Sequence, residues 1–302
     1  MLSTIIDGLS LGAIYALIAL GYTMVYGIAK MLNFAHGDII MVGAYSIYAV
    51  QSLGASVMNG MSDGSGKTAL SVLFAVLTVV IPVLVCTVLG ILVERFAYKP
   101  LRGASPLAVL ITAIGVSFLL QGGAQLIFGV TPIPMDFKIS GKIGEFNVYT
   151  IVTLAVAAVL MIALTLFVKF TKTGRAMVAV SEDRGAAQLM GVNVNGIIAL
   201  TFGIGSALAA VASIFYVMLI PQITPTLGSM PGIKAFTAAV IGGIGSIPGA
   251  MLGGILLGLV EQICNSIPVL ADFTTAIEFS LLIVILLVKP SGLLGKKRNE
   301  KV

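Results

Sequence analysis

The sequence predicts an all-α fold, a polytopic bundle of transmembrane helices. Hydrophobic residues make up 58% of the chain and charged residues only 10%, whereas charged residues are about a quarter of a typical soluble domain. A soluble fold cannot hide this much apolar surface, because much of any globule faces water. The apolar residues form unbroken runs of about 20 residues, the length with which a helix crosses a bilayer. A β-barrel would instead require short strands of alternating apolar and polar residues.

Eight apolar segments predict the membrane helices. They cover residues 9–26, 39–53, 70–93, 107–128, 148–168, 197–219, 233–263 and 274–288. The seventh is too long for one ordinary span, and its Gly- and Pro-containing middle, 242–249, divides it into the pieces 233–241 and 250–263. Broken or half helices of this kind are common where a transporter lines its path. The chain, 1–302, is therefore expected to be a single transmembrane domain with eight or nine membrane segments.

Clusters of basic residues predict which connections are cytoplasmic. The clusters follow the third, fifth and last segments: Arg95, Lys99 and Arg102; Lys169, Lys172, Arg175 and Arg184; Lys289, Lys296, Lys297, Arg298 and Lys301. With these three places inside, an odd number of crossings must separate the sixth segment from the tail. Dividing the seventh segment meets this condition and gives nine crossings with an outside N-terminus. Eight crossings plus a re-entrant piece is the alternative.

Catalytic and metal sites are not expected. The chain has one histidine, and its two cysteines, Cys86 and Cys264, lie inside apolar segments as small core residues. Gly-Ser-Gly-Lys-Thr at 64–68 is similar to the end of a phosphate-binding loop, but Met61 occupies the position of the required earlier glycine. We therefore expect residues 64–68 to form a flexible outside loop and the chain to have no ATPase site.

A polar break separates the first two segments. Asn33, His36 and Asp38 lie there between apolar neighbours, and polar side chains at a membrane boundary are costly unless they cap helices or line water. In a local interpretation Asn33 or Asp38 caps the following helix, since hydrogen-bond acceptors suit a helix N-terminus. In a functional interpretation the break lines a path. The two interpretations are compatible.

A second polar stretch, 173–196, predicts a short cytoplasmic helix over about 182–190. Ser181 is the expected N-cap, Glu182 and Asp183 the acidic first turn, and Gly191 the C′ residue. Ala186, Ala187 and Met190 share one face by their spacing. This small apolar face suits either a helix lying flat on the membrane or docking into a groove of another protein.

Two carboxylates, Glu261 and Glu278, fall inside apolar segments near their ends. An ionisable group at membrane depth is a functional candidate. Both are expected simply to reach the membrane interface. The sequence suggests no set of buried charges that face one another, which weakens the hypothesis of an ion-coupled carrier.

Three stretches together resemble a known family. The first is Leu-Asn-Phe-Ala-His-Gly-Asp at 32–38 with Gly-Ala-Tyr at 43–45; the second is Glu-Arg at 94–95 with Tyr-Lys-Pro-Leu-Arg-Gly at 98–103; the third is Thr-Gly-Arg-Ala at 173–176 with Glu-Asp at 182–183, Ala-Ala at 186–187 and Met-Gly-Val at 190–192. By their order and spacing, and by the 242–258 stretch, the chain resembles the membrane permease subunit of bacterial ABC importers for branched-chain amino acids. The similarity is to the H-type subunit of the high-affinity leucine/isoleucine/valine system and covers about 9–295.

The resemblance implies a multi-pass protein of the bacterial inner membrane, surrounded by lipid. Its partners would be a second, usually different, permease subunit, two cytoplasmic ATP-binding subunits that hydrolyse ATP, and an external substrate-binding protein. The chain itself would be no enzyme and would bind no cofactor and no nucleic acid. Residues of about 170–195 would form the cytoplasmic loop that couples to the ATPase, and 289–302 a cytoplasmic tail.

The resemblance assigns a coupling surface: Gly174, Arg175, Glu182, Asp183, Ala186, Ala187, Met190 and Gly191. The two breaks occupy comparable places in the two halves of the chain, as in a transporter with an internal repeat. We therefore expect a substrate path along Asn33, His36, Asp38, Gly242, Gly243, Gly245 and Gly249.

Three alternatives remain open. Related permeases carry urea or short amides, so the substrate could differ. A secondary carrier would use an ion gradient and would require Glu261 or Glu278. A membrane protein without transport activity would need a nucleophile–base pair or a ligand cluster, and the sequence shows neither.

Overall fold

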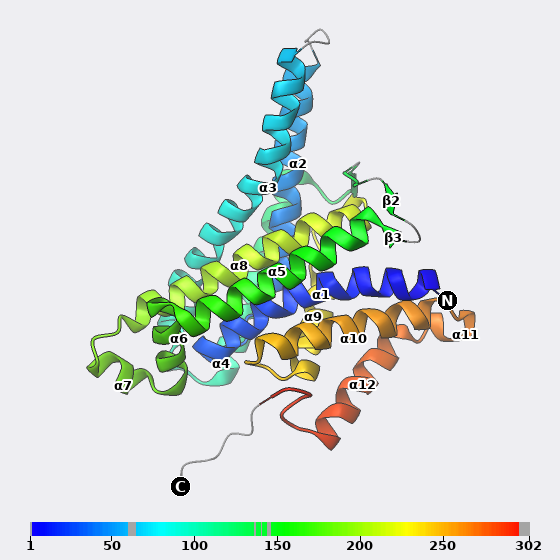
Figure 1. The fold of residues 1–302 in the computed structure, drawn as a ribbon. Helices are drawn as coiled ribbons and strands as arrows, with labels where there is room; N and C mark the ends of the chain where they lie inside the picture. Colours follow the sequence, from blue (N-terminus) through cyan, green and yellow to red (C-terminus); the bar gives the residue numbers. More distant parts are fainter. Residues whose placement is uncertain (1, 60–64, 136, 140, 144–145, 296–302) are drawn as a thin grey trace.

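The computed structural model describes residues 2–295 except 60–64, 136, 140 and 144–145, and the predicted tail residues Lys296, Lys297, Arg298 and Lys301 lie outside the described part. The described residues form a bundle of helices (Figure 1). The long apolar helices are α1 (Leu2–Ala29), α2 (His36–Met58), α3 (Ser65–Val93), α4 (Pro106–Phe128), α5 (Val148–Phe170), α8 (Val194–Leu219) and α10 (Ile247–Asn265). Within the described residues these seven are long and apolar enough to cross a membrane.

Shorter elements connect these helices. A π-helical turn, η1 (Glu94–Tyr98), and a 3₁₀ turn, η2 (Lys99–Leu101), extend α3. The remaining helices are α6 (Lys172–Glu182), α7 (Arg184–Leu189), α9 (Ser229–Gly242), α11 (Pro268–Ala271) and α12 (Thr274–Val288). Two-residue strands form two antiparallel pairs: β1 (Ile133–Pro134) with β4 (Gln222–Ile223), and β2 (Lys142–Ile143) with β3 (Phe146–Asn147). The polytopic all-α prediction is confirmed.

The first helix is the centre of the bundle. Most of α1 is buried, and it packs against α5, α8, α9 and α10. Its closest approach is to α10, where a methyl group on Gly258 would overlap the backbone of Gly12, and one on Gly254 would overlap Ala16. Small residues allow such backbone contact where no hydrophobic effect drives association. Glycines on both helices therefore set how tightly the centre of the bundle can close.

The predicted division of the seventh segment is confirmed. It forms two helices, α9 and α10, separated by a tight connection in which Gly243 and Gly245 adopt left-handed φ angles of 105° and 96°. With 14 residues, α9 is about 21 Å long, shorter than the hydrocarbon core of about 30 Å. It is therefore a half helix.

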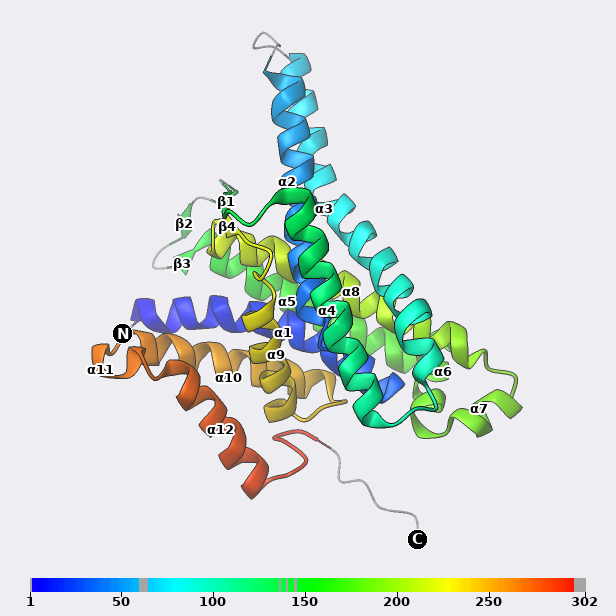
Figure 2. The ribbon, with the colours of Figure 1, turned by 180° about the vertical axis from the view of Figure 1, so that it is seen from behind.

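The two ends of the bundle differ. α6, α7 and the start of α4 lie at one end, and the N-terminus, α11, β2 and β3 lie at the opposite end (Figures 1 and 2). The basic residues after η1 and those of α6 and α7 thus share one end, as the predicted inside connections require. The side of the membrane that this end faces stays a prediction from the positive-inside rule.

One connection differs from the expectation. Residues 65–68, expected in a flexible loop, form the first turn of α3. The expectation gave too much weight to the two glycines as loop residues. An apolar run follows them directly, and the helix that it forms extends back through this turn. The outer halves of α2 and α3 run together away from the rest of the bundle (Figures 1 and 2).

Candidate functional site

The break between α1 and α2 is an ordered polar connection. Lys30 leaves α1 with a φ of 54°, and the chain then passes through the buried Asn33, whose side-chain oxygen accepts a hydrogen bond of 2.8 Å from the Tyr98 hydroxyl of η1. Residues 94–103, the second of the three stretches typical of the family, thus hold the first, 32–38, in place. Sequence spacing could not reveal this pair, because the two residues lie 65 positions apart, one in a connection and one in η1.

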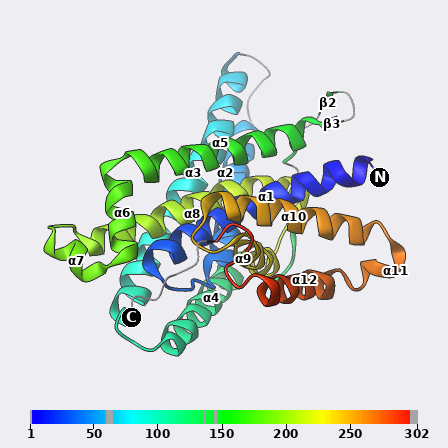
Figure 3. The same ribbon diagram turned by 60° about the horizontal axis from the view of Figure 1, so that its bottom comes forward.

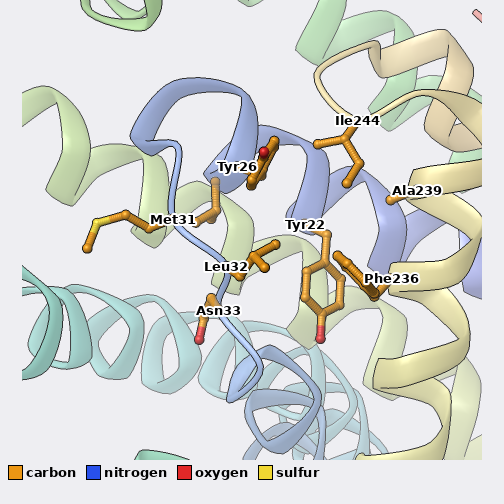
Figure 4. A pocket seen from close by; sticks show the side chains of 9 residues that line it. Tyr22, Tyr26, Met31, Leu32, Asn33, Phe236, Ala239 and Ile244 are labelled. Atoms are coloured by element: carbon orange, nitrogen blue, oxygen red, sulfur yellow. The ribbon is translucent and has the colours of Figure 1, made fainter. Parts of the chain in front are cut away.

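The two predicted breaks lie beside each other. Figure 4 shows Leu32 and Asn33 of the first break around a small cavity with Ile244 of the second break and Phe236 of α9. Gly245 also lies against Gly27 near the end of α1. The structure therefore brings together the two regions that were predicted to line one path.

His36 and Asp38 lie in the first turn of α2, and both are buried. The capping interpretation is wrong: Ala35 is the N-cap, and no side chain caps this helix end. Asp38 lies too far into the helix to cap it, although its charge complements the helix dipole. The His36 ring packs edge-on against Tyr22, with ring centroids 4.6 Å apart.

Asp38 contacts a residue that the sequence did not single out. The amide nitrogen of Gln121 on α4 donates a hydrogen bond of 2.9 Å to Asp38 Oδ1, and lies 3.2 Å from the hydroxyl oxygens of both Ser117 and Ser229. Ser229 is the first residue of α9. Gln121 therefore joins the start of α2 to the start of α9.

The starts of α2 and α9 also touch through their backbones. A methyl group on Gly228 would overlap the carbonyl oxygen of Gly37, and one on Gly232 would come 2.8 Å from the Gly37 Cα atom. The N-termini of two helices that begin inside the bundle thus converge. Such convergence is found in transporters where half helices face a substrate.

The predicted path glycines mostly occupy packed positions. Gly242 and Gly249 are buried and press against each other where α9 meets α10, and Gly243 packs against Gly295. Only Gly245 of this set is exposed. Close packing explains these glycines by itself, and their place along a path stays a prediction.

The polar stretch 173–196 forms two helices instead of one. α6 begins at Lys172 with Thr171 as its N-cap, and its Gly174 packs directly on the end of α5. The predicted N-cap Ser181 and first-turn residue Glu182 belong to the end of α6. The expectation of one helix over 182–190 is therefore wrong at its start, because Asp183 adopts an extended conformation that separates α6 from α7.

Asp183 and Gly191 delimit α7. The Asp183 carboxylate accepts a hydrogen bond of 3.0 Å from the Ala186 amide and is the N-cap. At the other end Gly191 has a φ of 81°, and the amides of Gly191 and Val192 donate to the carbonyls of Gln188 and Ala187. This is a Schellman motif, so the predicted C′ role of Gly191 is confirmed.

The apolar face of α7 differs from the predicted one. Ala187 is buried, whereas Ala186 and Met190 are exposed. Leu189 is 90% exposed and Met190 84% exposed. The exposed apolar surface of α7 is therefore Ala186, Leu189 and Met190, which have a helical spacing of three and four.

α7 is tied to the end of α1. The Arg184 guanidinium donates to the carbonyl oxygen of Ala29, the last residue of α1. Arg102 pairs with the buried Glu94 and donates to Asn195 at the start of α8. Burial lowers the pKa of Arg184 from its usual value, with the nearby charge of Arg102 contributing further. A cavity of about 790 Å³ lies between these groups and is lined by Lys30, Arg102, Glu182 and Arg184 together with apolar residues of α4.

Buried charges that face one another are present, contrary to expectation. Lys234 of α9 lies 2.6 Å from a Glu261 carboxylate oxygen and 3.2 Å from one of Glu278. The Tyr15 hydroxyl donates to Glu261 at 2.7 Å. The sequence prediction failed because it treated each carboxylate alone and overlooked Lys234. We call Lys234, Glu261 and Glu278 the charge cluster.

The comparisons with known proteins agree with this architecture. The family model described as "Branched-chain amino acid transport system / permease component" matches residues 4–287. The chain belongs to this family. The break between α1 and α2, the helices α6 and α7, and the divided seventh segment all lie inside the matched region.

Three relatives extend over most or all of the chain. This chain is 40% identical to the high-affinity branched-chain amino acid transport system permease protein LivH of Escherichia coli (strain K12). The alignment covers 100% of this chain and 97% of that relative. The chain is 43% identical to BraD of Pseudomonas aeruginosa, over 100% and 98% of the two chains. It is 30% identical to a probable LivH of Methanocaldococcus jannaschii, over 92% and 88%. No solved structure matches the chain.

Proposed function

We propose that this permease is the membrane-spanning subunit of an ATP-driven importer that carries branched-chain amino acids across the bacterial inner membrane. The observation that carries the proposal is the full-length similarity to permeases named for this transport, at 40% and 43% identity. The scarcity of charged residues, 10% of the chain, also suits apolar cargo. The energy would come from separate ATP-binding subunits, and no cofactor would bind to this chain.

The partners follow from the same membership. A second permease subunit, of a different sequence, would complete the path, and an external substrate-binding protein would deliver the amino acid. Two ATP-binding subunits would dock at the basic end. The exposed Ala186, Leu189 and Met190 support docking at α7, because a helix lays apolar anchors of this spacing into a groove.

The geometry supports a route for the coupling. Movement of α7 would reach the end of α1 through the Arg184–Ala29 hydrogen bond. The break that follows α1 is held by the Asn33–Tyr98 hydrogen bond, and it leads directly into α2. Under this proposal the predicted coupling residues Gly174, Arg175, Glu182, Asp183, Ala187 and Gly191 shape or support α6 and α7.

Reconstitution tests the function. The complete importer in liposomes should accumulate labelled leucine only with ATP and the external binding protein present. Uptake by this chain alone, driven by a proton or sodium gradient, would instead identify a secondary carrier. Uptake of urea or short amides in preference to leucine would overturn the substrate assignment while leaving the importer class intact.

A further inference from the structure

A buried carboxylate without a cationic partner lies where the start of α2 meets the start of the half helix α9. Asp38 is 2% exposed, and in the described part of the chain no lysine or arginine nitrogen lies within ion-pair distance of it. The buried Lys234 is engaged by Glu261 and Glu278. Charges at membrane depth normally pair with one another. A carboxylate without a cationic partner in this place is therefore suited to bind a cationic group transiently.

The surroundings of Asp38 are neutral hydrogen-bonding groups. Gln121, Ser117 and Ser229 gather around it, and all three are only partly buried. Gln121 is a flexible side chain, so its rotation uncovers the carboxylate. An ammonium group can replace the Gln121 amide as the donor to Asp38, and the charged hydrogen bond is the stronger one.

A positive counterpart lies close by. Ser229 begins α9, whose N-terminus carries no side-chain cap and is the positive end of the helix dipole. The Ser229 amide donates to the Thr226 carbonyl and Pro231 has no N–H, so the dipole and the Ser229 hydroxyl are the features offered to an anion here. Asp38 and Ser229 are both within hydrogen-bond distance of the same Gln121 nitrogen. A negative group and a positive helix end thus lie on the same side-chain amide, that of Gln121.

We propose that Asp38 binds the α-ammonium group of the amino acid in transit, while the first turn of α9 faces its α-carboxylate. The inference rests on the proposed function and adds the chemistry that recognises the cargo. A site of this kind selects zwitterionic α-amino acids over urea and amides, which carry no ammonium group. The apolar side chain of the cargo would face the apolar surfaces of α2 and α4.

The first test compares uptake by the complete importer carrying Asp38→Asn, Asp38→Glu or, as the matched control, Asp7→Asn at an exposed carboxylate. Loss of a buried charge partner predicts that Asp38→Asn slows leucine uptake per assembled importer about thirtyfold or more. Asp38→Glu should recover part of the rate, and Asp7→Asn should resemble the unchanged protein. If Asp38 serves as a neutral acid in the packing, Asn will support normal uptake, and that result overturns the inference.

A second test does not depend on the folding of an Asp38 variant. Ser117→Cys places a thiol at the edge of the site, and Ser52→Cys places one at an exposed position of α2 as the control. Leucine with the binding protein should slow thiol modification at 117 several-fold and leave position 52 unaffected. Equal modification with and without leucine contradicts the site. If the unaltered importer carries no leucine, the proposed function itself fails, so the two failures are distinguishable.

Discussion

Lys234 lies 2.6 Å from Glu261 and thereby joins the half helix α9 to α10, inside a bundle whose outer surface is lipid-facing. Glu278 of α12 lies 3.2 Å from the same ammonium group. α9 is shorter than the hydrocarbon core of the membrane, so crossing the membrane cannot by itself fix its position. Its N-terminus contacts α2 at the proposed site. The charge cluster therefore fixes the height and rotation of the helix on which that site depends.

Removing the central cation should destabilise the permease. Lys234→Met would leave the buried Glu278 and the partly buried Glu261 without a cation, and breaking a buried ion pair in this way costs about 3–5 kcal/mol. The thermal unfolding temperature in detergent should fall clearly, whereas Lys99→Met at an exposed position should not change it. Combining Lys234→Met with Glu278→Gln should recover part of the loss. A double variant that is less stable than the single one would contradict this account.

The Arg184–Ala29 hydrogen bond should matter for coupling more than for stability. Arg184→Ala removes the link between α7 and the end of α1, so ATP hydrolysis by the assembled importer should continue while leucine uptake per ATP falls several-fold. Arg95→Ala, at an exposed arginine on the same end of the bundle, is the control. The ratio of uptake to hydrolysis is the measurement. An unchanged ratio in Arg184→Ala would exclude this route.

The exposed end of α7 should be required for docking. Leu189 and Met190 are well exposed and contribute little to the fold of this chain, so Leu189→Ser with Met190→Ser should leave its unfolding temperature unchanged. Co-purification of the ATP-binding subunits should be lost, since apolar anchors at an interface core carry much of its binding energy. Val178→Ser, on the exposed side of α6, is the matched control. Full retention of the subunits by the double variant would place docking elsewhere.

The α9–α10 contact should tolerate no side chain. Gly253→Ala would press its methyl group onto the carbonyl of Ala238, and overpacking of this kind costs about 1–3 kcal/mol. Gly115→Ala on α4 has open space around it and should be neutral or stabilising, because glycine weakens a helix interior. Comparing the two unfolding temperatures checks the contact. Equal stability of both variants would show that α10 can move away from α9 without penalty.

Figure 3 shows the bundle with the bottom of the Figure 1 view turned forward: α9 and α10 lie beside α1, and α12 packs against α9 and α10. Apolar length predicted most of these helices, and glycine content predicted the division of the seventh segment. Both are local properties, so a single sequence carries them. The position of Ser181 inside α6 was missed because serine favours N-caps over helix interiors, whereas here its hydroxyl donates to the Val178 carbonyl of the same helix.

The sequence by itself determined that this protein is an all-α membrane bundle, where its polar breaks lie and to which family it belongs. Hydrophobic length and the order of short motifs are sufficient for that, because the bilayer constrains each segment separately. Only the tertiary structure decided that Lys234 contacts two carboxylates, that Gln121 donates to Asp38, and that Ala187 faces inward while Leu189 faces outward. These relationships depend on how the helices rotate and cross. Side-chain packing between distant segments sets that geometry, and the periodicity along one segment does not reveal it.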